Sequence, residues 1–261
     1  MSPSPAEHSA PTFAALTAPE YVVFTSAREA VGYAAQLCGT PAPTDPPGEV
    51  PDSSPERIVL SDTAQNSLRR DYLGRLLFNE LAATADVRVS EPAAHESSFA
   101  VTDDAVAVST PIQATTVATT SEDESTVERT REAAAHAFEA GEAYGLPGGT
   151  LSTFRERVAE EFDENLRSDF ISALQAPGET VDQQRAVVAA AANDCSLYAV
   201  SGLLEECGLA SKATISRAKT TLEDAGAIET TQIAQEVGRP RQRLHLADEV
   251  IGEDYPDVAA V

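Results

Sequence analysis

The stretch from Val181 to Ala247 constrains the fold more than any other part of the chain. Three helix-length runs follow one another in it, each with apolar residues at spacings of three and four. These runs cover Val181–Ala192, Leu197–Cys207 and Lys212–Ala225. Gly208 and Gly226 directly follow the second and third runs, where helices commonly end in the left-handed conformation that glycine adopts easily. The short turn between the last two helices is typical of a helix-turn-helix.

Two alternating runs follow the third helix. Ala227–Gln232 and Arg243–Ala247 alternate apolar and polar residues, as strands with one buried face do. Between them, Val237–Gln242 contains the glycine and proline of a turn. Helices followed by such a hairpin predict a C-terminal winged helix-turn-helix over residues 177–248.

The third helix and the hairpin carry the candidate nucleic-acid contacts. The helix is expected to bury its apolar stripe and to turn its cations and hydroxyls outward, where a major groove presents phosphates and base edges. Arginines at the hairpin tip are suited to gripping the DNA backbone. The candidate contacts are Ser211 (also the expected helix cap), Lys212, Thr214, Ser216, Arg217 and Lys219 on the helix, and Arg239, Arg241 and Arg243 on the hairpin.

The chain as a whole is strongly acidic, with 42 acidic against 18 basic residues and a formal net charge of −24. Lys212 and Lys219 are its only lysines. This composition indicates adaptation to molar intracellular salt, where a Debye length of about 3 Å screens carboxylate repulsion; an acidic mesophilic protein is the alternative. Residues 212–245 nevertheless hold 6 cations and 4 anions, so the predicted contacts lie on a local exception to the charge of the chain.

Residues 20–176 are expected to form an α/β or α+β domain with a sensing or dimerising role. Its expected strands are Tyr21–Phe24, Ile58–Ser61, Asp86–Ser90, two runs around a turn at Asp103–Asp104, and Thr115–Ser121. Its expected helices are Ser26–Leu37, Asp62–Ala83, one from about residue 122 to Ala143, and Ser152–Leu174. The helix over Asp62–Ala83 joins two strands, which predicts a parallel pair. Residues 1–19 are expected to be a disordered tail and 249–261 an acidic tail.

The C-terminal segments LYAVSGLLEECGLASKATISRAKTTLEDAGAIETT and VGRPRQRLHL resemble the archaeal winged helix-turn-helix regulators. That family has a hydroxyl-capped recognition helix and a Gly-Arg-Pro turn in its wing. The N-terminal part is loosely similar to the sensor half of TrmB-type sugar-responsive regulators, a non-catalytic phospholipase-D-like domain. Taken whole, the chain resembles the haloarchaeal TbsP-like regulators. The resemblance implies action on metabolic genes together with a TrmB-type partner regulator.

Neither a catalytic centre nor a metal or cofactor site is expected. The cysteines, Cys38, Cys195 and Cys207, are odd in number and lack metal-ligand spacing. The histidines, His8, His95, His136 and His245, are not followed by the x-Lys that phospholipase-D chemistry needs. The N-terminus does not look like a signal peptide, and the chain has no apolar run of the roughly 18 residues that a membrane span needs. A soluble, reduced, cytoplasmic protein is therefore expected.

These observations predict a transcriptional regulator that binds promoter double-stranded DNA sequence-specifically through its C-terminal winged helix. We expect a homodimer whose N-terminal domain responds to a small-molecule metabolite. The rival binding hypothesis makes the winged helix a protein-interaction module that docks another regulator. An enzyme in residues 20–176 is the third hypothesis, and neither a nucleophile–base pair nor a metal cluster in the sequence supports it.

Overall fold

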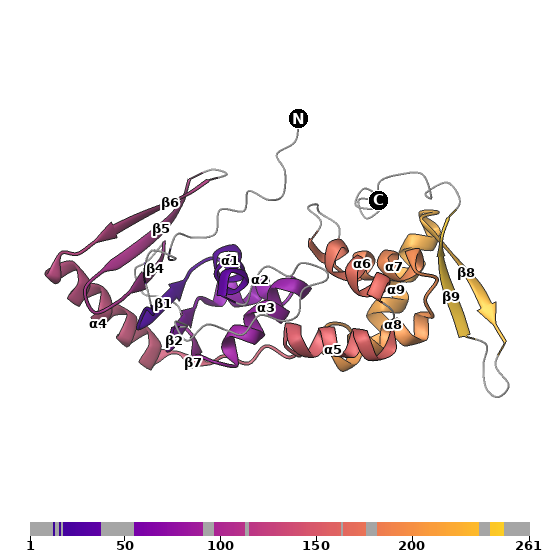
Figure 1. The fold of residues 1–261 in the computed structure, drawn as a ribbon, viewed down its shortest axis with the longest axis horizontal. Coiled ribbons are helices and arrows are strands. Elements are labelled where there is room, and N and C mark those ends of the chain that lie inside the picture. Colours follow the sequence, from indigo (N-terminus) through magenta and orange to yellow (C-terminus); the bar gives the residue numbers. More distant parts are fainter. Residues whose placement is uncertain are drawn as a thin grey trace. The chain divides into compact units, whose positions relative to one another are not determined.

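The computed structural model describes residues 13, 16, 18–37, 55–90, 97–112, 115–162, 164–175, 182–234 and 241–247. These residues form two compact units, which divide between Leu146 and Pro147 (Figure 1). The sequence predicts a boundary between residues 176 and 177. The two units divide earlier in the chain, so the helices over 151–161 and 164–175 belong to the second unit. The limits of the domains, with the two expected tails, remain a proposal.

Seven strands of the described chain form one mixed sheet in the first unit, in the order β6-β5-β4-β1-β2-β3-β7. The strands are β1 (Tyr21–Phe24), β2 (Arg57–Leu60), β3 (Asp86–Val89), β4 (Ser98–Val101), β5 (Val106–Ile112), β6 (Thr115–Ser121) and β7 (Glu142–Ala143). β1, β2 and β3 pair in parallel, and the remaining neighbours pair antiparallel. The parallel pair predicted from the strand–helix–strand pattern is confirmed, as is the α/β character of this part of the chain.

The four residues of β1 are all buried, because helices cover both faces of this strand. The helices of this unit are α1 (Ala27–Leu37), α2 (Asp62–Leu68), α3 (Tyr72–Ala82) and α4 (Glu124–Ala140). On one face, Tyr21 and Val23 belong to a cluster with Val127 and Ala134 of α4. On the other face, Phe24 contacts aromatic rings of α1 and α3 and the ring of Phe13. Phe13, which lies within the expected N-terminal tail, is only 1% exposed and packs into this core.

The single helix expected over Asp62–Ala83 is wrong, because two capped helices occupy that stretch. The carboxylate of Asp71 accepts the backbone N–H of Gly74 at 2.6 Å and starts α3 anew. Leu68 and Tyr72 are four residues apart and both buried, so the apolar period runs through the break without showing it. The hydroxyl of Ser61 caps α2, and Asp62 is the first residue of that helix. Further on, α4 ends at Ala140, before the expected Ala143.

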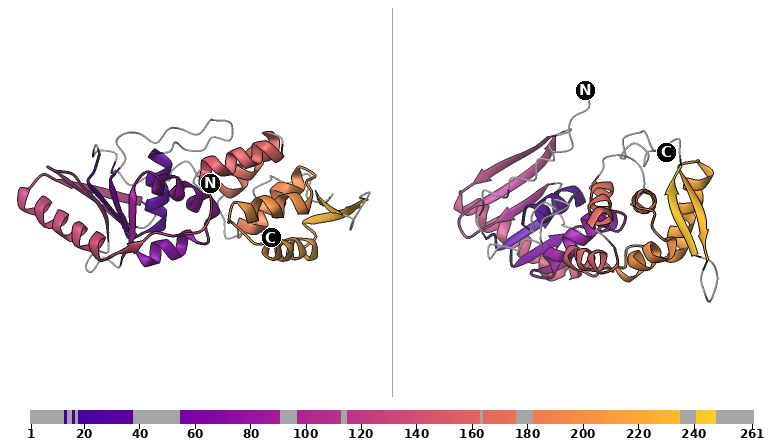
Figure 2. Two further views of the ribbon diagram at one scale, coloured as in Figure 1. Left: turned by 90° about the horizontal axis from the view of Figure 1, so that it is seen from below. Right: turned by 45° about the vertical axis from the view of Figure 1, so that its right-hand side comes forward.

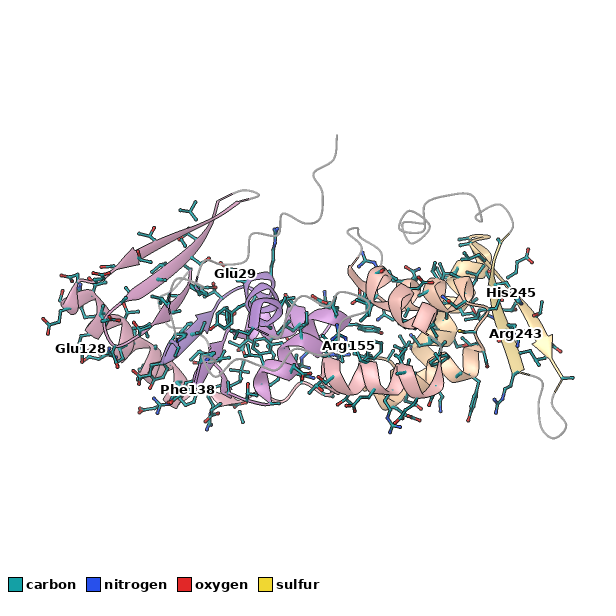
Figure 3. All side chains as sticks on the ribbon, viewed as in Figure 1. Glu29, Glu128, Phe138, Arg155, Arg243 and His245 are labelled. Atoms are coloured by element: carbon teal, nitrogen blue, oxygen red, sulfur yellow. The ribbon has the colours of Figure 1, made fainter. Side chains whose placement is uncertain are left out.

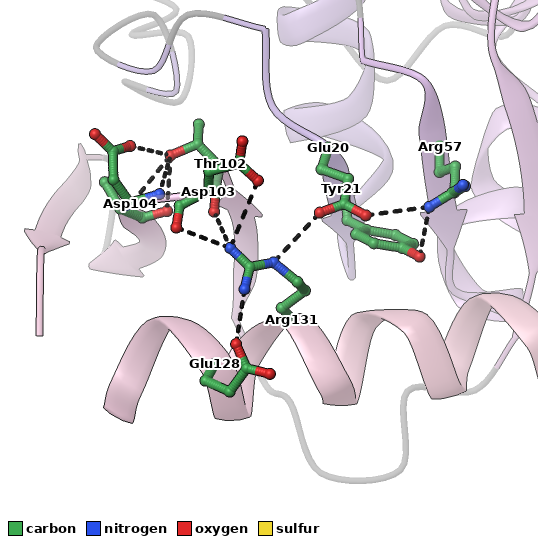
Figure 4. Close-up of polar contacts among 9 residues, drawn as sticks. Glu20, Tyr21, Arg57, Thr102, Asp103, Asp104, Glu128 and Arg131 are labelled. Carbon is green, nitrogen blue, oxygen red and sulfur yellow. Dashed lines mark hydrogen bonds and ion pairs between the residues drawn. The ribbon is translucent and has the colours of Figure 1, made fainter. Parts of the chain in front are cut away.

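Arg131 of α4 fixes the β4–β5 turn onto the helix (Figure 4). Its guanidinium donates to the backbone carbonyls of Thr102 and Asp103, each at 2.9 Å, and pairs with Glu128 at 2.8 Å. It also lies 3.3 Å from a carboxylate oxygen of Glu20, which stands just before β1. The hairpin predicted around Asp103–Asp104 is thus present and bonded to the helix that covers it.

The second unit contains helices followed by a hairpin, and Figure 2 shows the two long strands of this hairpin as arrows. Its elements are α5 (Leu151–Glu161), α6 (Glu164–Gln175), α7 (Asp182–Ala192), α8 (Leu197–Glu206), α9 (Lys212–Asp224), β8 (Ile228–Ile233) and β9 (Arg241–Leu246). The last three predicted helices and the hairpin are confirmed within two residues at each end. The single helix expected over Ser152–Leu174 is wrong, because the backbone at Phe162 is extended (φ −137°) and separates α5 from α6.

Candidate nucleic-acid interface

The sequence at both ends of α9 fixes its length. The hydroxyl of Ser211 accepts the backbone N–H of Thr214 at 3.2 Å, which confirms Ser211 as the N-cap. At the other end, Gly226 has a φ of +72°, and the N–H groups of Gly226 and Ala227 return to the carbonyls of Glu223 and Leu222. These two bonds form a Schellman motif, which satisfies carbonyls that a helix end otherwise leaves unpaired.

The turn between α8 and α9 is built in the same way. Gly208 has a φ of +66°, and its N–H and that of Leu209 bond to the carbonyls of Glu205 and Leu204. The approach to α5 packs against this turn, because the N–H of Gly149 donates to the carbonyl of Cys207 at 3.0 Å. A Cβ at Gly208 would lie 2.7 Å from the Cα of Gly148, so a side chain there would collide with backbone.

The apolar stripe of α9 packs into the core of the second unit. The polar residues of α9 are of two kinds, exposed and covered. Ile215, Ala218 and Leu222 are buried. Lys212, Ser216 and Arg217 are exposed, and Thr214 is half-buried. The expected outward face is therefore present at these positions.

Lys212 is exposed but already has a protein partner. Its ammonium Nζ lies 3.0 Å from a carboxylate oxygen of Glu205 on α8, and its backbone N–H donates to the other oxygen at 3.4 Å. Hydrogen bonds with Lys212 lower the pKa of Glu205, and those with Glu205 raise the pKa of Lys212. A phosphate that binds Lys212 would therefore compete with Glu205 for its ammonium.

Lys219 does not point outward as expected. Its side chain is 11% exposed, and its Nζ lies 2.7 Å from the carboxylate of Glu223, one helical turn later. Glu223 also accepts the hydroxyl of Thr230 on β8 at 2.7 Å. Position 219 borders the buried stripe at Ala218 and Leu222, so the aliphatic stem packs inward and only the ammonium reaches its partner. Glu223 thereby joins α9 to the hairpin, and Lys219 pairs with Glu223 within α9.

The hairpin carries Arg241 and Arg243 on one face and the buried Leu244 on the other. Their strand pairs with β8 through Ile233 opposite Arg241 and Thr231 opposite Arg243. Arg239 lies outside the described residues. The predicted arginines that can be placed are thus both exposed at the hairpin.

The hairpin is bonded to the connection between α7 and α8. The N–H of Leu244 donates to the carbonyl of Cys195 at 2.9 Å, and Ser196 forms an isolated bridge with Arg243. His245 shares a 2.5 Å hydrogen bond with Asp194 and a 2.8 Å bond with the hydroxyl of Thr231. Figure 3 labels Arg243 and His245, both of which belong to β9. These contacts fix the base of the hairpin against the helices.

Tyr198 is a candidate site residue that the sequence reasoning missed. It lies in the first turn of α8 and is 57% exposed. Its ring has the guanidinium carbon of Arg241 at 4.4 Å and the Nζ of Lys212 at 5.8 Å from its centroid. The available signal was its position: the apolar stripe of α8 passes through Val200, Leu203 and Leu204, which leaves the Tyr198 ring outside it.

A buried carboxylate in the first unit is already satisfied within the fold. Glu29 of α1 is 5% exposed and accepts the hydroxyls of Ser98 and Ser109, each at 2.5 Å. The described residues contain neither a group of three or more His, Cys, Asp or Glu side chains that could hold a metal ion nor a helix long and apolar enough to cross a membrane.

Comparison with known families supports the helix-turn-helix interpretation. Residues 150–260 match the family model for the C-terminal HTH domain of TbsP-like transcriptional regulators. The match begins at Thr150, the N-cap of α5, so it spans α5 and α6 as well as the helix-turn-helix and the hairpin. No curated protein and no solved structure matches the chain. The family match supports a DNA-binding regulator of TbsP-like type.

Proposed function

We propose that the protein regulates transcription by binding promoter DNA sequence-specifically, with α9 as the recognition helix and β8–β9 as the wing of a winged helix-turn-helix. The observation that carries the proposal is the joint exposure of donors on two elements: Lys212, Ser216 and Arg217 on α9, and Arg241 and Arg243 on β9. Donors on one helix face are what the major groove reads, and cations beside it suit the phosphate backbone.

The predicted contacts take different roles in this proposal. Base and phosphate contacts are assigned to Lys212, Thr214, Ser216 and Arg217, and backbone contacts to Arg239, Arg241 and Arg243. Ser211 is assigned to capping α9 and to a phosphate contact through its exposed hydroxyl. Lys219 is assigned to pairing with Glu223, whose carboxylate also accepts the hydroxyl of Thr230 on β8.

The acidic composition bears on how such contacts work. We propose that the protein acts at molar salt, where counterion release contributes little to affinity. Direct hydrogen bonds at short range then supply most of the discrimination between sequences. The wing and α9 are suited to this because they lie on the segment with more cations than anions.

For the N-terminal part, we propose a sensing and dimerising role in the control of metabolic genes, with a TrmB-type partner regulator. A small-molecule effector would change promoter occupancy only if it binds the DNA-competent and DNA-incompetent dimer geometries unequally. The family match covers only residues 150–260, so this part of the proposal rests on the sequence resemblance.

Chromatin immunoprecipitation of the full chain in its native host, followed by mobility-shift assays in molar KCl, tests the proposal. We expect Lys212→Glu with Arg217→Glu to abolish binding to the recovered fragments, because two donors become carboxylates on the proposed groove face. Lys219→Glu is unsuitable here, since it would set a carboxylate against Glu223 at a largely buried position, whereas Lys212 and Glu205 are about half exposed.

Arg157→Glu is the matched control, because Arg157 is an exposed arginine of α5 in the same unit. It should bind DNA as the wild type does. Unchanged affinity in the double α9 variant would refute the recognition-helix assignment. Capture of a second regulator without promoter fragments would favour the rival hypothesis of a protein-docking module.

A further inference from the structure

We infer that Tyr198 is a positioning residue of the DNA interface, whose ring holds Lys212 and Arg241 ready for one stretch of the sugar-phosphate backbone. The inference rests on the proposed function and extends it to a residue outside the recognition helix and the wing. The three side chains come from α8, α9 and β9, so the ring joins elements that the sequence separates.

The exposure of Tyr198 is the first observation. Among the described residues, Tyr198 and Val117 are the large apolar side chains that remain exposed, and Val117 lies in the other unit. Single exposed apolar residues are common on protein surfaces. Exposure therefore needs a second observation before it indicates a role.

The placement of the two cations supplies that observation. Both lie within the roughly 6 Å range in which a ring face attracts a cation, Arg241 at 4.4 Å and Lys212 at 5.8 Å. Arg241 and Lys212 are also two of the residues assigned to DNA contact on other grounds. The exposed ring thus lies where the proposed recognition helix and wing supply cations together.

The ring gives Lys212 a partner that DNA does not have to displace. Glu205 holds the ammonium at 3.0 Å, and a phosphate would compete directly with that carboxylate. Tyr198 attracts the cation through its ring face. When Lys212 exchanges Glu205 for a phosphate, the ring keeps its side chain near the interface.

Such an arrangement is useful in concentrated salt. Long-range attraction between cations and DNA is screened there, so affinity depends on side chains that need little ordering on binding. Each long side chain that is ordered beforehand contributes a factor of about two or more to affinity. For Lys212 and Arg241 together, we expect a contribution of about fivefold.

The test uses the full-length protein in molar KCl and a fluorescent duplex that the wild type selects from a randomised library. Tyr198→Phe keeps the ring and should bind within about twofold of the wild type. Tyr198→Leu should raise the Kd about fivefold. It should not lower the melting temperature of the protein, because Tyr198 is exposed. In an Arg241→Gln background, the effect of Tyr198→Leu should shrink to about twofold, because only Lys212 remains to be positioned.

Each other outcome overturns a stated part. A wild type that selects no duplex refutes the proposed function itself. If the wild type binds but Tyr198→Leu binds equally well, the positioning role is refuted. A fivefold loss that persists in the Arg241→Gln background would show that Tyr198 acts independently of that cation, and equal losses for Phe and Leu would assign the effect to the phenol hydroxyl.

Discussion

Lys212 and Lys219 lie two turns apart on α9 and should respond in opposite ways to the same substitution. Methionine removes the charge of lysine and keeps a side chain of similar length. The side chain of Lys212 is 51% exposed and that of Lys219 is 11% exposed. We therefore expect Lys212→Met to weaken DNA binding with little change in stability, and Lys219→Met to lower stability first.

The size of the stability loss follows from the surroundings of Lys219. Breaking a fully buried ion pair costs about 3–5 kcal/mol, whereas an exposed pair contributes about 0–1 kcal/mol. Glu223 is 27% exposed and keeps its hydrogen bond from Thr230, so its carboxylate would be only partly uncompensated. The expected loss for Lys219→Met is about 1–2 kcal/mol, and for Lys212→Met it is below about 0.5 kcal/mol.

Calorimetric melting of the full chain in molar KCl measures the loss of stability. Fluorescence anisotropy with the selected duplex measures the loss of DNA affinity. For a unit of this size, the Lys219→Met variant should melt roughly 5 °C below the wild type. The reasoning would be refuted if Lys219→Met melted with the wild type and lost DNA affinity as Lys212→Met does. That result would place the Lys219 ammonium in the groove and not at Glu223.

Four further predictions concern the same unit. Gly226→Ala should cost about 1 kcal/mol in urea unfolding, because alanine is strained at a φ of +72° in otherwise open space. Gly208→Ala should cost at least about 2 kcal/mol more, because its Cβ would also meet the backbone of Gly148; equal losses would contradict that close approach. Burial raises the pKa of the Cys207 thiol to about 11, so iodoacetamide at neutral pH should alkylate it more slowly than Cys195, as peptide mass spectrometry would show, unless the protein is unfolded. Burial raises the pKa of Glu223, but hydrogen bonds from Lys219 and Thr230 outweigh it and lower the pKa overall. The stabilisation from the Glu223 carboxylate is therefore fully present above the ordinary glutamate pKa of about 4.3 and is lost as the pH falls through the lower pKa of the folded protein. The melting temperature of Glu223→Gln should therefore fall less steeply on acidification than that of the wild type.

Periodicity located the elements of the chain but not the breaks between them. Helices α8 and α9 were predictable because each has one buried stripe and is followed by a glycine in the left-handed conformation, Gly208 or Gly226. The stretch Asp62–Ala83 has an unbroken apolar period, and the carboxylate cap at Asp71 ends one helix and starts another. A local side-chain hydrogen bond therefore decided the structure where the pattern allowed either outcome.

Helix geometry predicted which residues of α9 face outward, except for the direction of one side chain, Lys219. Lys212 and Arg217 lie far from the buried stripe and face outward as expected. Lys219 lies at the edge of the stripe, where the position of Glu223 and Thr230 decides which way a long stem packs. Tyr198 was missed because its partners come from two other elements, and such a meeting depends on tertiary structure.

The close approach of Gly148 to Gly208 determines where the second unit can be joined to a different N-terminal domain. The chain enters the second unit at Pro147 and is bonded to the α8–α9 turn before α5 begins. A chimera joined at Pro177 would discard the segment that rests on the turn, together with α5 and α6, and would expose the carbonyl of Cys207. A chimera joined ahead of Pro147 keeps this support of the turn. The segment from Pro147 to the end of β9 should therefore be transferred as one piece.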